Sequence, residues 1–407
     1  MTERRQAGFI PSLDGLRGIA IVLVMLHHLT YYRPASGIDA AIADVVFFFW
    51  TGVDLFFVLS GFLITGILLD TRDSRRYFSS FYARRILRIF PLYYLVLFLA
   101  FVVLPLFPAV HAVVVAQDVS VDLPPQWPYW VFLTNFSIAE RGWVHGWVDV
   151  AWSLAIEEQF YLIWPLVIWL SPSRLIAWLC TAIFVAEVFA RSYARASDVE
   201  VLPIYVVTWF RVDGLVMGAL LAVALRKGIM PSLTRLAPYV SVAAIAGLVA
   251  VTILGGHTWW WNRRMQQFGY SLIALLAGAM LVGAIGRPAE SLWPRMLSSG
   301  WLRAFGKYSY CLYLIHLPVM RAVREWVFNP EEYQALSVAP WIGQVLFYPA
   351  VVAPAFALAW LSWRFFEAPI LRLKARFPYE TSEPALAAAA AANLTPSPET
   401  RLQPPPG

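Results

Sequence analysis

Long uninterrupted apolar stretches recur along the chain, and they restrict its fold more than any other feature. About ten of them approach the roughly 20 residues that an α-helix needs to cross a bilayer. Only 14% of the residues are charged, against about 25% in soluble domains, which excludes a water-soluble fold. We therefore predict an all-α, polytopic transmembrane helical bundle of about ten spans. The stretches lie at 17–33, 48–70, 89–116, 153–170, 174–190, 202–225, 236–256, 268–286, 304–325 and 343–366.

Basic residues predict the orientation of these spans, because loops rich in Lys and Arg stay in the cytoplasm. A further stretch, 127–140, is too short and polar for a span. If it stays on one side, the basic clusters between the spans fall mostly inside, whereas the acidic loop at Glu331 and Glu332 falls outside. We expect an inner (plasma) membrane protein with both termini cytoplasmic and an external segment at 117–152.

Composition also limits the partners of the chain. The net charge of +6 is explained by membrane topology, so the expected surroundings are a lipid bilayer and no nucleic-acid partner is predicted. Cys180 and Cys311 both lie in apolar segments, and neither a disulfide framework nor a metal site is expected. The membrane domain should span 1–376. The Ala- and Pro-rich residues 377–407 are predicted to form a disordered tail.

Ionisable groups inside spans are costly and are functional candidates by default. His28 lies eleven residues after Arg17 in the first apolar stretch, and eleven helical steps return to nearly the same face, about 16 Å further on. This spacing places a cation near the inner surface in line with an imidazole at membrane depth. The alternative is that His28 makes a helix contact and Arg17 anchors to head groups. His27, the neighbouring imidazole, should point about 100° away.

Glu157 and Glu158 enter another apolar stretch side by side. Adjacent carboxylates on a helix diverge by about 100°, so they should not act as a pair in one pocket. One is a catalytic or orienting candidate and the other a structural one. An Asn or Ser hydrogen-bond network, or an ion pair with Arg211, is the purely structural alternative.

A basic turn at Arg84, Arg85 and Arg88 leads into a span with Pro91 just inside it. Guanidinium groups bind phosphate bidentately, so this turn is a candidate site for the phosphates of a nucleotide-bearing donor. A charge run of this kind is also a common positive-inside signal. Elsewhere Asp54 requires a buried partner, and the hydroxyls and imidazole between Tyr308 and His316 are expected to serve in helix packing.

Together these segments resemble the acyltransferase-3 family of integral membrane acyltransferases, over about residues 9–375. The opening Leu13-Asp14-Gly15-Leu16-Arg17-Gly18 with His28 resembles the arginine, ten residues, histidine motif of that family. Later blocks follow in the same order at Gly52–Phe62, Arg84–Pro91, Trp152–Tyr161 and Gly306–His316.

The resemblance implies an enzyme that moves an acyl group, usually acetyl from acetyl-CoA, to a hydroxyl of a cell-envelope saccharide or lipid-linked glycan. Arg17 and His28 match the essential pair of the family, and Arg84, Arg85 and Arg88 match its donor-handling motif, whereas His27 has no counterpart. Acyl-CoA is then the donor substrate, with no tightly bound cofactor. The 407 residues contain no fused hydrolase-like domain such as some relatives carry, so we expect transfer to finish in the membrane domain over 1–376 or on a separate extracytoplasmic partner.

The residues and the resemblance lead to one hypothesis: acyl-CoA binds by its phosphates to the arginine turn, and its thioester reaches His28. His28 is then either a general base or a transient acyl carrier, and Glu157 or Glu158 orients the imidazole or the sugar. Acylation of a small secreted molecule such as a macrolide, a secondary transporter and a structural scaffold for envelope assembly are the alternatives.

Overall fold

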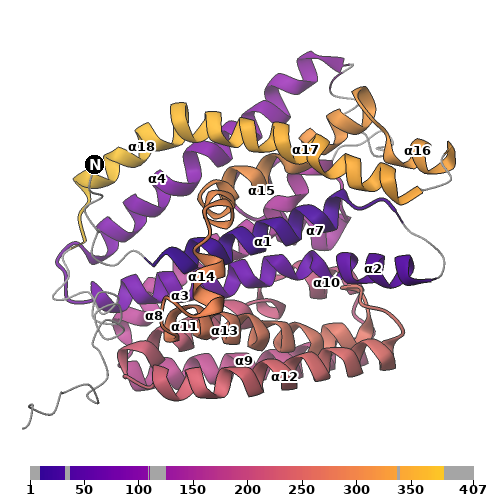
Figure 1. The fold of residues 1–407 in the computed structure, drawn as a ribbon. Coiled ribbons are helices and arrows are strands. Elements are labelled where there is room, and N and C mark those ends of the chain that lie inside the picture. Colours follow the sequence, from indigo (N-terminus) through magenta and orange to yellow (C-terminus); the bar gives the residue numbers. More distant parts are fainter. Residues whose placement is uncertain (1–9, 33–36, 109, 111–124, 337–339, 380–407) are drawn as a thin grey trace, which may run out of the picture.

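The computed structural model describes residues 10–32, 37–108, 110, 125–336 and 340–379, and every regular element in them is a helix (Figure 1). The first half of the chain forms α1 (Pro11–Leu29), α2 (Ile38–Phe47), η1 (Phe48–Thr51), α3 (Gly52–Asp70), α4 (Tyr77–Phe98), η2 (Leu99–Val103), η3 (Leu104–Leu106), α6 (Trp127–Trp130), α7 (Thr134–Arg141), η4 (Gly146–Val150), α8 (Ala151–Leu170) and α9 (Ser173–Ala196). The second half forms α10 (Val201–Val206), η5 (Thr208–Phe210), α11 (Asp213–Arg226), α12 (Met230–Gly255), η6 (Met265–Gly269), α13 (Tyr270–Gly286), α14 (Leu292–Leu297), α15 (Gly300–Trp326), α16 (Pro330–Leu336), α17 (Pro340–Ser362), η7 (Trp363–Glu367), α18 (Ala368–Arg372) and η8 (Leu373–Arg376).

An all-α, multi-pass membrane bundle is confirmed, but the number of candidate spans differs from the expected ten. Seven helical segments among the described residues are long and apolar enough to cross a membrane: Pro11–Leu29, Asp39–Asp70, Tyr77–Leu106, Ser173–Ala196, Met230–Gly255, Met265–Gly286 and Trp341–Arg376. The remaining apolar stretches correspond to α8, α11 and α15. These are helical, but α8 carries two adjacent glutamates, α11 has only 14 residues and α15 carries several charged side chains.

The stretch 202–225, expected as one span, is broken between α10 and α11. The physical reason is Arg211, which lies in the break and is fully buried. Its side chain reaches Asp54 of α3 and the carbonyl of Tyr205, and the helix resumes at Asp213. The weaker stretch 127–140 is divided between α6 and α7, with four and eight residues, and neither is among the candidate spans. Residues 380–407 of the expected tail lie outside the described residues.

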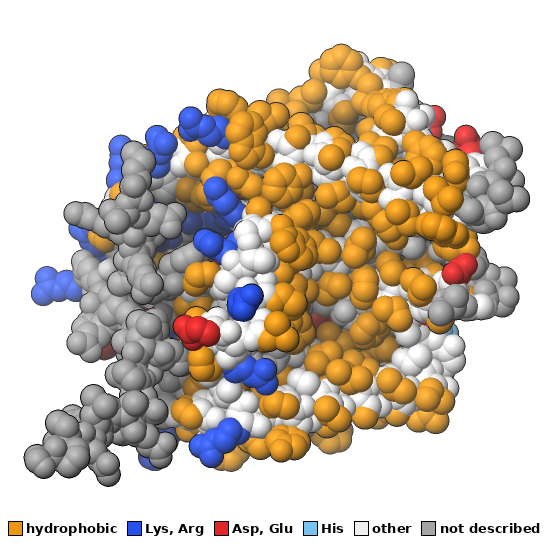
Figure 2. All heavy atoms as spheres, viewed as in Figure 1, with side chains coloured by type: hydrophobic (Ala, Val, Ile, Leu, Met, Phe, Trp, Pro, Cys, Tyr) orange, Lys and Arg blue, Asp and Glu red, His pale blue; other side chains and the backbone are white. Residues whose placement is uncertain are grey.

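The helices form an inner group enclosed by outer ones. We compared the most apolar 18 residues of each candidate span. In the spans that contain α3 and α13, 72% of these residues are buried, against 17% in α9 and 22% in α12. The outer helices instead expose large apolar side chains such as Trp178, Tyr239 and Ile253. Figure 2 shows hydrophobic side chains over the middle of one face and Lys and Arg gathered at one end. The outer face is therefore suited to lipid, and the inner group holds the polar chemistry.

Glycines allow the inner helices to cross closely, as is common between membrane helices. A Cβ on Gly306 of α15 would lie 1.8 Å from the carbonyl oxygen of Asp14 in α1. One on Gly61 of α3 would lie 1.9 Å from the carbonyl oxygen of Leu215 in α11. Backbone contact at these crossings fixes α1 against α15 and α3 against α11, which brings the candidate site residues together.

Candidate functional site

A cavity of about 860 Å³ opens beside the end of α1, and both His27 and His28 line it. We call it the histidine cavity. Helical geometry predicts that the two imidazoles diverge by about 100°, yet both face the same cavity. His27 Nδ1 lies 2.9 Å from the carbonyl oxygen of Phe47, whereas His28 turns toward α15. A volume of this size is typical of small-molecule sites.

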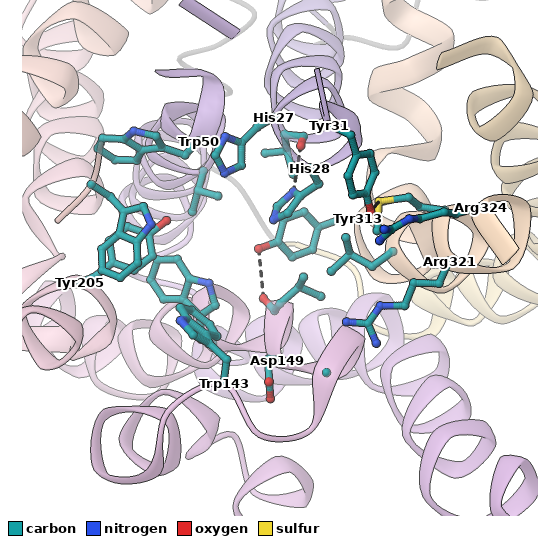
Figure 3. Close-up of a pocket in the computed structure, with 18 of the residues that line it drawn as sticks. His27, His28, Tyr31, Trp50, Trp143, Asp149, Tyr205, Tyr313, Arg321 and Arg324 are labelled. Carbon is teal, nitrogen blue, oxygen red and sulfur yellow. Dashed lines mark hydrogen bonds between the residues drawn. The ribbon is translucent and has the colours of Figure 1, made fainter. Parts of the chain in front are cut away.

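The walls of the histidine cavity differ in chemistry from side to side (Figure 3). Trp50, Trp143 and Tyr205 lie on one side and Arg321 and Arg324 on the other, with His28 and Tyr313 between them. The faces of aromatic rings pack against apolar surfaces, and guanidinium groups donate hydrogen bonds to anions. The cavity therefore offers both a stacking surface and hydrogen-bond donors.

Asp149 adds a carboxyl group to this cavity, from the short helix η4 that precedes α8. The Tyr129 hydroxyl and the backbone N–H of His145 donate hydrogen bonds to it. Burial nevertheless dominates and raises the pKa of Asp149 to about 7. The carboxyl is consequently largely neutral below that pH, which reduces the negative charge that the cavity presents.

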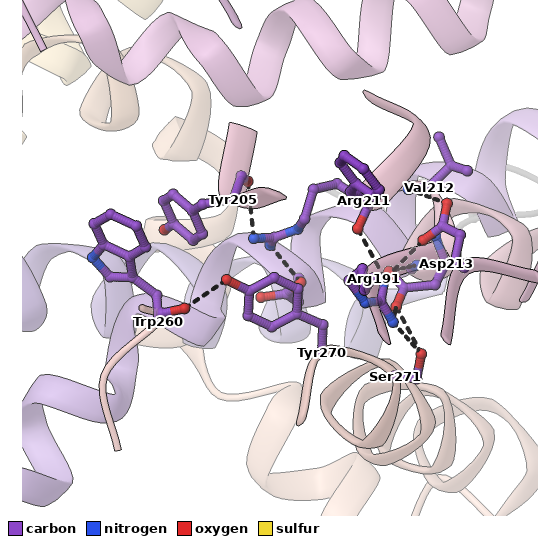
Figure 4. Close-up of polar contacts among 12 residues, drawn as sticks. Arg191, Tyr205, Arg211, Val212, Asp213, Trp260, Tyr270 and Ser271 are labelled. Atoms are coloured by element: carbon purple, nitrogen blue, oxygen red, sulfur yellow. Dashed lines mark hydrogen bonds and ion pairs between the residues drawn. The ribbon is translucent and has the colours of Figure 1, made fainter. Parts of the chain in front are cut away.

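A network of buried charges lies behind the aromatic wall (Figure 4). Arg211 donates to Asp54 at 2.7 Å, so the buried partner expected for Asp54 is found. Its guanidinium carbon lies 4.9 Å from the ring centroid of Tyr205 and 5.4 Å from that of Trp152, and both rings line the cavity. The structural alternative of an ion pair between Arg211 and Glu157 or Glu158 is not found among the described residues, where Arg211 pairs with Asp54.

A second pair of ions extends this network away from the cavity. Arg191 lies 3.0 Å from both Glu187 and Asp213, and all three side chains are almost fully buried. Ser271 donates to Asp213 and accepts a hydrogen bond from Arg191. Removing one partner of a buried ion pair typically costs about 3–5 kcal/mol. The network therefore fixes α9, α11 and α13 behind the cavity wall.

A smaller cavity of about 140 Å³ contains the other predicted residues, and we call it the arginine cavity. Arg17, Arg85, Arg88 and Glu157 all line it. Nε of Arg85 is buried there without a hydrogen-bond partner, whereas Arg17 contacts Asp14 at 3.4 Å and Arg88 contacts Glu367 at 3.6 Å. Ser60 and Tyr161, whose hydroxyls hydrogen-bond to each other, line this cavity beside Glu157.

The structure separates two residues from this group. Arg84 donates to the carbonyls of Lys374 and Phe377 at 3.0 Å each and stacks over Tyr379, so it holds the end of the membrane domain. Glu158 is not among the residues that line either cavity, and its Oε1 is buried without a hydrogen-bond partner. The predicted divergence of Glu157 and Glu158 agrees with this arrangement.

The two cavities are neighbours that share Val53 and Tyr313 in their walls. The Tyr313 hydroxyl lies 2.6 Å from Ser153 Oγ and 3.0 Å from the carbonyl oxygen of Val150. Arg17 and His28 therefore belong to adjacent cavities at successive levels of α1. Such an arrangement suits transfer of a small group from one side of this boundary to the other.

The sequence predicts a packing role for His316, but the structure places this residue against His28. It is fully buried on α15, and its Nε2 lies 3.3 Å from Nδ1 of His28. Tyr313 and the aromatic wall were also not selected as site residues. The i, i+3 spacing of Tyr313 and His316 showed that they share a helix face, but not that α1 crosses that face at His28.

Comparison with known proteins gives a family match over most of the chain. A family model described as an acyltransferase domain, acyltransferase-3, matches residues 10–364. The chain is 27% identical over 390 residues to the peptidoglycan O-acetyltransferase OatA of Listeria monocytogenes, covering 91% of this chain and 57% of that protein. It is 30% identical over 382 residues to the putative peptidoglycan O-acetyltransferase YrhL of Bacillus subtilis, covering 89% and 55%.

A third relative is the O-acetyltransferase OatA of Staphylococcus aureus, 27% identical over 381 residues, with 89% of this chain and 57% of that protein covered. The chain thus spans a little over half the length of the curated relatives that it matches. No solved structure matches it significantly.

Proposed function

The chain belongs to the acyltransferase-3 family, and on that basis we propose that it is an integral membrane O-acetyltransferase of the cell envelope. The donor is acyl-CoA, with acetyl-CoA the expected form, and the acceptor is a hydroxyl of an envelope saccharide. The observation that carries this proposal is the pair of adjacent cavities, one lined by arginines and the other by His28, with a shared boundary at Val53 and Tyr313. The names of the relatives support O-acetyl transfer to a saccharide.

The distribution of basic residues supports an orientation of the protein in the membrane. Figure 2 shows Lys and Arg gathered at one end of the visible face, and Arg17, at the start of α1, lines the arginine cavity. We place this end in the cytoplasm of an inner membrane by the positive-inside rule, with both termini on that side. The histidine cavity, at the other end of α1, then faces outward.

The arginine cavity is the proposed donor site. Arg85 lines the cavity and its buried Nε has no hydrogen-bond partner, and Arg17 and Arg88 add two further guanidinium groups. Phosphate groups of acyl-CoA would offset this concentration of positive charge at the cytoplasmic entrance. The small volume of about 140 Å³ favours a short acyl group such as acetyl.

The histidine cavity is the proposed acceptor site. Its Trp and Tyr rings supply stacking surfaces for a saccharide, and Arg321 and Arg324 lie opposite them. The volume of about 860 Å³ accommodates a sugar unit of a lipid-linked glycan beside His28. We propose that transfer finishes here, and a separate extracytoplasmic partner is required only if the glycan does not enter.

His28 would connect the two sites chemically. As a general base, it takes the proton of the acceptor hydroxyl while that oxygen attacks the thioester carbonyl, and the CoA thiolate leaves and recovers the proton. As an acyl carrier, it attacks the thioester first, releases CoA, and passes the acyl group to the hydroxyl. Both routes give an ester and free CoA, and both require an unprotonated ring nitrogen.

The test is complementation of a deletion strain, with envelope glycan acetate measured by mass spectrometry and normalised to inserted protein. We expect deletion to remove one class of glycan acetyl ester and the wild-type gene to restore it. His28→Ala should lower specific transfer by at least 10²-fold, the lower end of what general-base assistance contributes. His27→Ala should lose much less activity than His28→Ala, because Nδ1 of His27 lies 2.9 Å from the carbonyl oxygen of Phe47, and it is His28 that pairs with His316. Unchanged glycan acetylation after deletion would refute the envelope function, and wild-type specific activity in His28→Ala would refute the role of His28.

A further inference from the structure

His28 and His316 form a hydrogen-bonded pair in the interior of the protein, between α1 and α15. Nε2 of His316 lies 3.3 Å from Nδ1 of His28, and their ring centroids are 5.0 Å apart. His316 is fully buried. In the part of the chain that the structure describes, His28 reaches the histidine cavity, whereas His316 is not among the residues that line it.

The surroundings of His316 determine which of its nitrogens carries hydrogen. Its Nδ1 lies 3.0 Å from the carbonyl oxygen of Leu312 and 2.8 Å from that of Tyr313. Carbonyl oxygens only accept hydrogen bonds, so Nδ1 of His316 must carry the hydrogen. In the neutral ring, Nε2 is then a bare acceptor, and this is the atom that faces His28.

The same reasoning assigns the tautomer of His28. Its Nδ1 lies between two acceptors, the carbonyl oxygen of Val24 at 2.9 Å and Nε2 of His316 at 3.3 Å. Nδ1 of His28 must therefore carry the hydrogen, which leaves Nε2 unprotonated. The unprotonated nitrogen is the one that either catalytic route requires.

We propose that His316 is a positioning residue that fixes the ring plane of His28 and, together with the Val24 carbonyl, keeps the hydrogen on Nδ1 of His28. This inference rests on the role of His28 in the proposed function and extends it to a second histidine. When Nε2 of His28 takes up a proton or an acyl group, the ring becomes positive, and a hydrogen bond to a charged donor is stronger than one to a neutral donor. Nε2 of His316 then stabilises that charge without itself contacting the substrate.

Two variants of His316 separate this role from simple packing. His316→Gln places an amide oxygen near the former Nε2 and retains an acceptor for His28. His316→Asn keeps polar atoms near the carbonyls of its own helix but ends short of His28. We expect His316→Asn to lower kcat by about 10- to 100-fold, the loss of one hydrogen bond to a charged group, with little change in KM for acyl-CoA. His316→Gln should recover most of kcat.

Equal specific activities of the Gln and Asn variants, normalised to inserted protein, would overturn the proposal, because a packing role does not depend on an acceptor atom. The tautomer is measured independently of transfer by ¹⁵N NMR of histidine-labelled wild-type protein in micelles. The His28 resonances are identified by their loss in His28→Ala. We expect a protonated Nδ1 and a bare Nε2, and the opposite assignment would overturn the proposal. If His28→Ala transfers acyl groups at the wild-type rate, the proposed catalytic role of His28 is refuted. The NMR measurement still shows which ring nitrogen of His28 carries the hydrogen.

Discussion

At the scale of single residues, the structure distinguishes arginines that the sequence presents as one cluster. Arg84 and Arg85 are neighbours on α4, yet Arg84 donates to backbone carbonyls near the end of the membrane domain. Arg85 lines the arginine cavity instead. Substitution of Arg84 and of Arg85 therefore tests donor binding, because the two residues carry the same charge at adjacent positions but have different surroundings.

We expect Arg85→Ala to raise KM for acyl-CoA by about 10- to 100-fold, because a hydrogen bond to a charged group contributes about 1.5–3 kcal/mol. Arg84→Ala should leave KM nearly unchanged and lower the thermal stability of the purified protein. Steady-state kinetics in isolated membranes and melting in detergent measure the two effects. An equal rise of KM in both variants would mean that the basic turn acts only through overall charge.

At the scale of the helices, the crossing of α1 and α15 determines whether His28 and His316 meet. Gly306 contacts the backbone of α1 at Asp14 without room for a side chain, whereas Gly300, at the start of the same helix, has no atom within 4 Å of an added Cβ. Close packing of this kind tolerates even one methyl group poorly.

We expect Gly306→Ala to destabilise the protein by about 1–3 kcal/mol, the usual cost of overpacking, and to reduce acyl transfer per inserted protein by moving α15 away from α1. Gly300→Ala is the matched control and should behave as wild type in both measurements. Thermal unfolding in detergent and the transfer assay test this pair. Wild-type melting of Gly306→Ala would show that the crossing is looser than the backbone contact implies.

At the scale of the whole molecule, the proposed reaction depends on the direction in which the bundle crosses the membrane. In that proposal acyl-CoA comes from the cytoplasm and the acceptor saccharide lies outside, so the arginine and histidine cavities would have to open on opposite sides. Cysteine labelling in a variant without Cys180 and Cys311 tests this, with one exposed probe in each region. Glu140 at the end of α7 and Ser232 in α12 are both exposed.

A membrane-impermeant thiol reagent added to intact cells should label Glu140→Cys and not Ser232→Cys, because only the first is placed outside. After permeabilisation both positions should react, which shows that each cysteine is accessible. Labelling of Ser232→Cys alone in intact cells would reverse the orientation and place the arginine cavity on the side that acyl-CoA does not reach.

The sequence by itself determined the class of fold, because apolar stretches of about 20 residues with few charges have no other stable arrangement than membrane helices. It also identified Arg17, His28 and the arginine turn as candidates, since ionisable groups are expensive in a bilayer and periodicity assigns them to a helix face. The break at Arg211 was missed, because apolar flanks concealed a buried cation whose partner lies on α3.

Only the tertiary structure decided which of these side chains share a cavity. Helical spacing gives the direction of a side chain relative to its own helix but not the helix that it faces. Helical spacing therefore could not predict that Arg85 lines a cavity whereas Arg84 does not. Nor could it predict that His316 lies within 3.3 Å of His28, which is 288 positions away in the sequence. Contacts between helices depend on where their small residues permit backbones to cross, and that arrangement is a property of the packed bundle.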